Sequence, residues 1–510
     1  MMAAMKNARK TKPALLAWAF LSALGVLLIC SKSSPLYPTN DWVDVQCFFT
    51  VGRGILQGKM PYLDLYEQKG PVLYLFFALA ALISSESFLG VFILEVVCLG
   101  LFLYISTQIV ALWVRDAVWP LFLLPPVLAL SIGVSPAFSH GSSAEELFLP
   151  VIALFLKLAL TAIRENRALF KGEAFVCGIL VALALWVKYT FCGVFAGGVL
   201  ALLIWYIATK KANKLWVAVL YGLLGALAVT VPVLLWFWVK GALPALWQVY
   251  FVNNLTAYAA GKSPRHDPPL TALLNNRMWS LPAAVGCLWP LVRPKKQWSQ
   301  GLLLVLSAAV LSLFTYANGR TYPYYALILS AFSALGWIPV LLFLQWAFRK
   351  ASKNAVATGA VTLSGLLFIS SVFSAYKRSA NVYLMSYKQE DLPQYRFAEI
   401  IQQDDDASLL NLGFLDGGFY LASGVEPQNR FFCTFNFSLQ EQDQEHDELI
   451  QADAAKYIVV RGKKSPGRNY TLVDQCSFPF EGRNWTYSLY KLSDGSVNES
   501  SRKNPGKKAH

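Results

Sequence analysis

The stretch that decides the fold is LWVAVLYGLLGALAVTVPVLLWFW, which runs from Leu215 to Trp238 without a charged residue. A helix of about 20 apolar residues spans the roughly 30 Å hydrocarbon core of a bilayer and satisfies its own backbone hydrogen bonds there. A second such block extends from Tyr324 to Trp346. In the whole chain 56% of the 510 residues are hydrophobic, 15% are charged, and the mean hydropathy is +0.45. The sequence therefore predicts an α-helical polytopic membrane protein.

The net charge of +14 could indicate nucleic-acid binding, but the distribution of the charges argues against this function. The basic residues form short clusters between apolar blocks, which is typical of cytoplasmic anchors of membrane helices. Such a cluster precedes the first apolar stretch, residues 13–30, at Lys6, Arg9, Lys10 and Lys12. No A-x-A-like cleavage site follows, so we interpret this stretch as a retained first helix with a cytoplasmic N-terminus.

One apolar run, Pro71 to Ile83, is short for a membrane span, because about 13 residues give a helix of only about 20 Å. If this run lies in the membrane plane, about eleven transmembrane helices remain. They are 13–30, 88–112, 118–135, 147–163, 173–189, 191–209, 215–239, 278–292, 299–316, 323–347 and 355–375. The inner loops then carry Arg115, Arg164, Arg167, Lys171, Lys210, Lys211, Lys214, Arg293, Lys295, Lys296, Arg349, Lys350 and Lys353. This is the bias that the positive-inside rule requires.

The same topology gathers the polar loops 31–87, 136–146, 240–277 and 317–322 outside, together with everything after about residue 377. We expect a transmembrane domain at 1–376, whose outer loop 31–87 carries interfacial helices, and an extracytoplasmic α/β domain at 377–492. In the second domain, Ser408 to Phe414, Tyr457 to Arg461 and Trp485 to Tyr490 are strand-like, and the region near Ser438 to Ala455 is helix-like. A basic, disordered tail is expected at 493–510. Cys433 and Cys476 could form a disulfide outside the cell.

The first outer loop reads DWVDVQCFFTVGRGILQGKMPYLDLYEQKGP from Asp41 to Pro71. From Asp44 to Leu56 the apolar spacing fits a short amphipathic helix with Asp44 in its first turn. A carboxylate there is favoured by the helix dipole, so a purely structural role is one interpretation.

This loop has an acid at the helix start, then GRGILQG from Gly52 to Gly58, PYLD from Pro61 to Asp64, and KGP from Lys69 to Pro71. Taken together, these motifs resemble the first outer loop of the GT-C glycosyltransferases. These are polytopic enzymes that use polyprenyl-phosphate sugars, and they include protein O-mannosyltransferases and lipid A aminoarabinose transferases. The resemblance covers the membrane part and is nearest to uncharacterised bacterial members. It implies that Asp44 is the catalytic acid, with Asp41 as a lesser partner, and that Lys69-Gly70-Pro71 begins an interfacial helix. It also implies a bacterial plasma-membrane enzyme with an extracytoplasmic active site.

A second acidic motif, from His140 to Pro150, carries Glu145 and Glu146 at the outer start of a span. Acids at the membrane edge are costly and suggest a function, although a role at the start of a helix is also possible. Both glutamates are candidate catalytic residues beside Asp44 and Lys69. With His140 and Asp44 they could also hold a divalent metal ion, which is the one cofactor that we consider.

Cations at the outer face suggest a site for the donor phosphate. Lys188 ends its span, where snorkelling to the interface is the alternative interpretation. Arg320, in NGRTYPYY, has a guanidinium that binds oxyanions through two hydrogen bonds. We add Tyr322 and Tyr325 to this phosphate site. Relatives commonly have YPHYY here, but this chain has Tyr324 where the histidine would be, so no histidine role is expected.

The sequence thus predicts a glycosyltransferase that moves a sugar from a polyprenyl-phosphate donor to an extracytoplasmic glycan, lipid or protein acceptor. Membrane lipids are its other expected partners, and no nucleic-acid partner is expected. A transporter or flippase should instead place ionisable residues near mid-membrane, where only Glu95 comes close. A non-catalytic envelope assembly protein would not need acids and cations on one face. The sugar, the acceptor and the role of loop 240–277 stay open.

Overall fold

The computed structural model describes residues 2–114, 118–260, 268–293, 297–317, 319–462, 465–480 and 482–493. Arg115, Lys295 and Lys296, which were expected in inner loops, lie outside the described residues. The same holds for residues 494–510 of the expected disordered tail.

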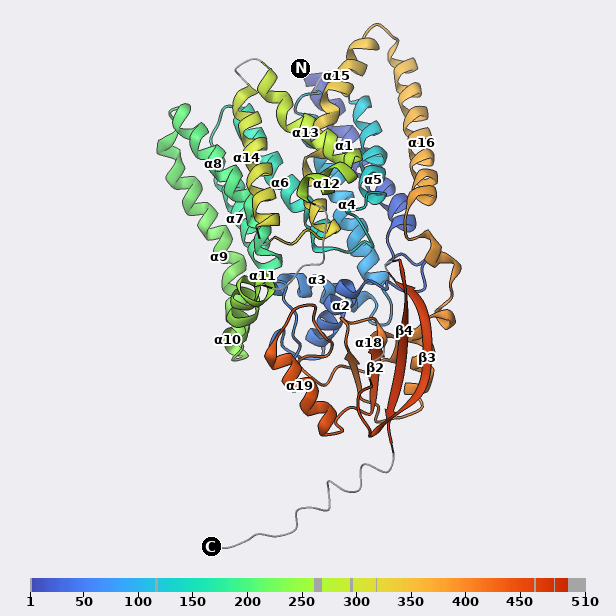
Figure 1. Cartoon of the computed structure of the whole chain (residues 1–510). Helices are drawn as coiled ribbons and strands as arrows, with labels where there is room; N and C mark the ends of the chain where they lie inside the picture. Colours follow the sequence, from blue (N-terminus) through green and yellow to red (C-terminus); the bar gives the residue numbers. More distant parts are fainter. Residues whose placement is uncertain are drawn as a thin grey trace.

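Long helices form one end of the molecule and a small sheet the other (Figure 1). Within the described residues, eight helical segments are long and apolar enough to cross a membrane: 12–30, 89–110, 144–164, 189–208, 212–239, 298–316, 323–347 and 354–378. They correspond to α1 (Met2–Cys30), α4 (Leu89–Val110), α6 (Ala144–Arg164), η2–α8 (Tyr189–Ala208), η3–α9 (Ala212–Val239), α14 (Trp298–Tyr316), η7–α15 (Pro323–Ala347) and α16 (Lys353–Arg378). All eight match predicted spans.

The three other predicted spans are shorter or broken helices. Residues 118–135 contain η1 (Trp119–Leu123) and α5 (Leu124–Gly133), and 173–189 contain α7 (Lys171–Val187). Residues 278–292 contain α13 (Arg277–Leu288) and η5 (Trp289–Val292). Prolines explain the breaks at Pro120, Pro125 and Pro290, because proline cannot donate a backbone hydrogen bond. The total of eleven stays a prediction.

Two of the basic clusters assigned to inner loops lie at the same end of the bundle. Figure 1 shows the α8–α9 and α15–α16 connections at the end of the bundle farthest from the sheet. These connections carry the basic clusters Lys210 to Lys214 and Arg349 to Lys353. The N-terminus also lies at this far end, and the orientation of the chain in a membrane stays a prediction.

Two short helices of the first outer loop lie between the bundle and the sheet domain: α2 (Val43–Leu56) and α3 (Pro71–Ile83) (Figure 1). The two helices pack closely at Gly52, where a Cβ atom would come within 2.7 Å of the Phe77 carbonyl carbon. The α3 helix buries one face and exposes Leu79, Leu82 and Ile83. A short helix with one exposed apolar face suits the membrane interface, as the sequence predicted.

The loop 240–277 contains α10 (Leu243–Leu246), η4 (Trp247–Asn253), α11 (Ala257–Ala260) and α12 (Pro269–Asn275), with 261–267 outside the described residues. Its η4 segment is a π-helix. Asn254 donates a hydrogen bond to the Gln68 carbonyl at 2.8 Å, and Asn253 donates one to Tyr66 at 3.1 Å. This loop therefore packs on the first outer loop.

The C-terminal domain combines a sheet with helices, as predicted, and the sheet has four strands, of which β3 was not predicted. Its strands are β1 (Leu409–Leu412), β2 (Tyr457–Arg461), β3 (Tyr470–Phe480) and β4 (Arg483–Leu492), in the order β1-β2-β4-β3. The β1–β2 pair is parallel and the other pairs are antiparallel. Its helices are α17 (Pro393–Ile401), α18 (Phe419–Ser423) and α19 (Gln440–Gln451), preceded by the turns η8 (Val382–Ser386) and η9 (Gln389–Asp391).

The C-terminal domain is joined to α2 by polar contacts. Arg53 forms an ion pair with Glu426 at 2.5 Å, and Thr50 donates a hydrogen bond to Asp416 at 2.6 Å. A single apolar core continues from the bundle through α2 into the sheet. The domain is therefore fixed against the outer loop.

Cys433 and Cys476 are both free in this structure, so the possible disulfide between them is not formed. The Cys433 sulfur is buried and lies 4.0 Å from the sulfur of Cys47 on α2, and both are free thiols. Cys476 lies on β3, where its thiol approaches the Ser477 carbonyl. The docking of the domain on α2 brings Cys433 beside Cys47.

The glycine of Lys69-Gly70-Pro71 is required by close packing. A Cβ atom at Gly70 would lie 2.0 Å from the carbonyl oxygen of Trp186, and the Gly70 amide donates to the Val187 carbonyl at 3.0 Å. The start of α3 is thereby held against the end of α7.

We therefore expect Gly70→Ala to destabilise the protein by about 1–3 kcal/mol, because backbone atoms cannot move aside as a flexible side chain would. Gly172→Ala is the matched control, since nothing lies within 4 Å of a Cβ atom there. Thermal unfolding in detergent measures both. Equal melting temperatures for the two variants would contradict the packing argument.

The topology predicts that Ser85, an exposed residue after α3, faces the extracytoplasmic side. A Ser85→Cys variant in a Cys476→Ser background should react with a membrane-impermeant thiol reagent added to intact cells. Asn213→Cys, exposed in the α8–α9 connection, should react only after the cells are opened. If Asn213→Cys but not Ser85→Cys is labelled in intact cells, the predicted topology is inverted.

Candidate active site

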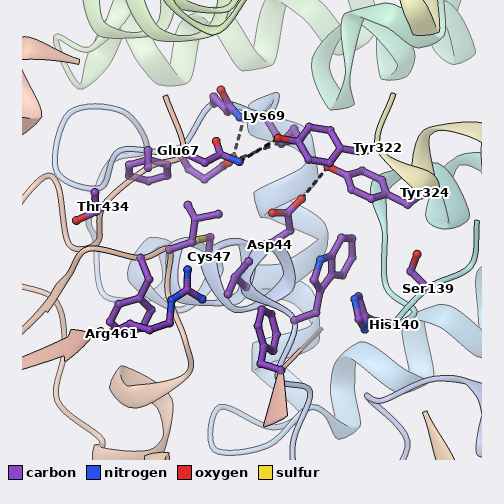
Figure 2. Close-up of a pocket in the computed structure, with 18 of the residues that line it drawn as sticks. Asp44, Cys47, Glu67, Lys69, Ser139, His140, Tyr322, Tyr324, Thr434 and Arg461 are labelled. Carbon is purple, nitrogen blue, oxygen red and sulfur yellow. Dashed lines mark hydrogen bonds and ion pairs between the residues drawn. The ribbon is translucent and has the colours of Figure 1, made fainter. Parts of the chain in front are cut away.

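A cavity of about 780 Å³ lies where the first outer loop, the membrane helices and the C-terminal domain meet (Figure 2). Its lining from the outer loop is Trp42, Val43, Asp44, Cys47, Glu67, Gln68 and Lys69. Loops at the helix ends add Ser139, His140, Tyr258, Tyr322, Pro323 and Tyr324. The C-terminal domain adds Gly413, Phe414, Leu415, Thr434, Phe435, Asn436, Phe480, Trp485 and two arginines, Arg461 and Arg483.

Asp44 lies in the first turn of α2 and lines this cavity. The hydroxyl of Tyr324 donates a hydrogen bond to its carboxylate at 3.0 Å, which is drawn in Figure 2. Trp42 packs edge-on against Tyr324, with ring centroids 5.2 Å apart, and so supports the same tyrosine. Asp44 is only partly buried and is therefore open to a substrate.

Asp41 occupies a different environment. Its carboxylate forms a buried ion pair with Lys32 at 2.6 Å, and its residue does not line the cavity. The sequence spacing put both acids at the start of one helix. Packing separates them, because Asp41 is buried against Lys32 whereas Asp44 faces the cavity.

Lys69 also lines the cavity and lies close to a carboxylate that the sequence analysis did not select. Its ammonium is 3.9 Å from Glu67, and Glu67 accepts hydrogen bonds from the Lys69 amide at 2.8 Å and from the Tyr74 hydroxyl. Burial alone would lower the pKa of Lys69, but the negative charges of Glu67 and Asp44 outweigh it and raise this pKa. Lys69 is therefore a fixed positive charge at neutral pH.

The residues predicted for donor phosphate form a connected layer beside the cavity. Lys188 forms an ion pair with Glu145 at 2.5 Å and lies over the ring of Tyr325, 3.9 Å from its centroid. The hydroxyls of Tyr325 and Tyr258 are 2.9 Å apart. Arg320 stacks on the Tyr258 ring at 3.6 Å and donates to the Tyr258 carbonyl at 2.6 Å.

Lys188 and Tyr325 line a smaller cavity of about 30 Å³, which shares Gln68, Lys69 and Tyr258 with the large one. Arg320 is buried and lines neither cavity. Its guanidinium donates a hydrogen bond at 3.4 Å to the hydroxyl of Tyr322, which lines the large cavity. The predicted phosphate residues are thus neighbours, although Arg320 is covered in this structure.

The four residues considered for a metal ion do not gather. Within the described residues, no three His, Cys, Asp or Glu side chains lie close enough to hold one. Glu145 pairs with Lys188, and Glu146 accepts a hydrogen bond from the Ser142 amide at 2.8 Å, as Glu95 does at 2.6 Å. Burial and the charge of Lys32 lower the pKa of His140, so its ring is neutral. The metal site therefore stays a prediction, and these four side chains do not form a metal-binding cluster in this structure.

Sequence reasoning missed part of the cavity. Tyr258 belongs to loop 240–277, whose role the sequence left open, and no residue of the C-terminal domain was a candidate site residue. A signal for Tyr258 existed in the aromatic spacing of its loop. The residues of the C-terminal domain gave no such signal, because their place at the cavity depends on docking.

No family model matches the sequence, and no curated protein matches it. Two solved structures of ArnT from Cupriavidus metallidurans resemble the chain. The first, bound to undecaprenyl phosphate, has a TM-score of 0.61 and 13% identity, with coverage of 92% of this chain and 98% of ArnT. The second, in the apo state, has a TM-score of 0.58 and 14% identity, with coverage of 94% and 98%. The chain therefore has the fold of ArnT, which is the GT-C fold that its outer-loop motifs predicted.

Proposed function

We propose that this protein is a membrane glycosyltransferase that transfers a sugar from a polyprenyl-phosphate donor to an extracytoplasmic acceptor. The observation that carries the proposal is the Asp44 carboxylate, which faces a cavity of about 780 Å³ and is oriented by Tyr324. Pockets of about 300–1,000 Å³ enclose molecules as large as a substrate headgroup. The shared fold with ArnT, whose crystal structure holds undecaprenyl phosphate, supports this donor class.

Asp44 acts in this proposal as the general base. It takes the proton from the acceptor hydroxyl while the acceptor oxygen forms a bond to C1 of the donor sugar. The bond between C1 and the phosphate oxygen breaks, and the polyprenyl phosphate leaves with the bonding electron pair. Tyr324 holds the carboxylate in place, and Lys69 supplies a permanent positive charge near the reacting groups.

The leaving phosphate belongs with Lys188, Arg320, Tyr322 and Tyr325. Lys188 follows the end of α7, where a lipid phosphate at the membrane surface can reach it. The adjoining tyrosine hydroxyls can donate further hydrogen bonds to phosphate oxygens. Glu145 positions the Lys188 ammonium before the donor arrives.

The transporter alternative is not favoured by the position of Glu95. This glutamate is buried in α4 but accepts hydrogen bonds from Ser31 at 2.7 Å and from Ser142 at 2.6 Å, both in outer loops. It therefore lies near the outer end of the bundle. A transporter places its ionisable groups near the bilayer midplane.

Asp44→Asn tests the proposal, because asparagine keeps the size of the side chain and can still hydrogen-bond to Tyr324 but cannot accept a proton. We expect a folded protein whose transfer rate falls by at least about a hundredfold. The assay follows release of undecaprenyl phosphate from a panel of undecaprenyl-phosphate sugars, with native membranes as the source of acceptor. Full activity would reduce Asp44 to a residue that stabilises the start of α2.

Asp41→Asn is the control for Asp44→Asn. It breaks the buried ion pair with Lys32, so it should lower stability by about 3–5 kcal/mol while the folded fraction keeps its rate. A larger loss of transfer rate per folded molecule at Asp41 than at Asp44 would show that the catalytic acid is misassigned.

A further inference from the structure

Two arginines of the C-terminal domain line the large cavity: Arg461 at the end of β2 and Arg483 at the start of β4. Figure 2 shows Arg461 on the opposite side of the cavity from Tyr322 and Tyr324. Its guanidinium lies 4.6 Å from the ring centroid of Trp485. Arg483 and Trp485 are two residues apart on β4, so their side chains point to the same face of the sheet. Trp485 is therefore flanked by two cations.

Among the described residues, no carboxylate pairs with either of these two arginines. Within the residues that the structure describes, neither side chain makes an ion pair or a hydrogen bond. Other arginines of the same domain are paired, Arg396 with Asp474 at 2.6 Å and Arg430 with Glu441 at 3.1 Å. The described residues of the C-terminal domain that line the cavity include no Asp or Glu. Two unpaired guanidinium groups on one wall provide a site for an anion.

The same wall offers groups that suit a saccharide. Phe414, Phe480 and Trp485 present apolar ring surfaces, against which the C–H face of a sugar ring can pack. Asn436 and Thr434 add an amide and a hydroxyl for sugar hydroxyls. The wall thus combines surfaces for a sugar ring with two cations.

We infer that this wall binds the acceptor, and that the acceptor is a saccharide carrying a phosphate or carboxylate group. The inference rests on the proposed function, since it assigns the second substrate of the same cavity. The donor phosphate is tied to a lipid, so it must stay near the helix ends that carry Lys188. Figure 1 shows the sheet at the end of the molecule opposite the long helices. A water-exposed acceptor can therefore reach the cavity from the side of the sheet.

The full-length protein in lipid nanodiscs provides the test, with thermal stabilisation at constant ionic strength as the readout. The probes are glucose 6-phosphate, glucuronate and glucose. We expect at least one of the two anionic sugars to stabilise the protein and glucose not to do so. Comparison of the two anionic probes shows whether phosphate or carboxylate is the preferred group. No stabilisation by either anionic probe at millimolar concentration would overturn the inference.

The double variant Arg461→Gln/Arg483→Gln should bind the anionic sugar at least about tenfold more weakly, because it loses charge-assisted hydrogen bonds. Arg468→Gln, at an exposed arginine of the same domain that does not line the cavity, is the matched control and should bind as the wild type does. Wild-type affinity in the double variant would overturn the inference.

Binding of undecaprenyl phosphate, measured in parallel, separates this inference from the proposed function. The double variant should bind it as well as the wild type does. Loss of lipid binding with unchanged sugar binding would assign the arginines to the donor and overturn the inference. Failure of the wild type to bind undecaprenyl phosphate, with arginine-dependent binding of the anionic sugar, would instead count against the proposed function and support an anion site on this wall.

Discussion

The ion pair between Lys188 and Glu145 is the interaction on which the candidate site depends. It joins the first turn of α6 to the end of α7 at 2.5 Å, at the membrane edge, where an unpaired charge is costly. Lys188 in turn lies over Tyr325, whose hydroxyl meets that of Tyr258, and the Tyr258 ring and carbonyl hold Arg320. One pair therefore orients a layer of cations and tyrosines beside the cavity.

The site divides its parts among three regions of the chain. The outer loop supplies the carboxylate of Asp44 and the ammonium of Lys69, the helix ends supply the cations and tyrosines, and the C-terminal domain closes the cavity. These regions are held together by close backbone contact at Gly70 and by the ion pair between Arg53 and Glu426. Such rigidity suits a site in which a base and a phosphate must be held at fixed positions around a sugar.

Sequence patterns predicted the elements well and the long-range contacts poorly. Long apolar blocks predicted the helices, and the strand-like stretch from Tyr457 to Arg461 predicted β2 with the bounds that the structure has. The partner of Cys433 was missed because Cys47 is 386 residues away and meets it only through domain docking. The family resemblance ranked Asp44 above Asp41, but only packing shows their different surroundings, the ion pair with Lys32 for Asp41 and the cavity for Asp44. Arg461 was missed because nothing local shows that β2 ends at a cavity.

A structure of the full-length protein with undecaprenyl phosphate tests the central claim most directly, since the claim is that cations at the helix ends hold the donor phosphate beside Asp44. The account predicts phosphate density within hydrogen-bonding distance of the Lys188 ammonium, with Tyr325 and Arg320 contributing from the same layer. The vacant part of the large cavity should then lie between this phosphate and the wall that carries Arg461. Phosphate density between Arg461 and Arg483, or at a place remote from Asp44, would contradict the account.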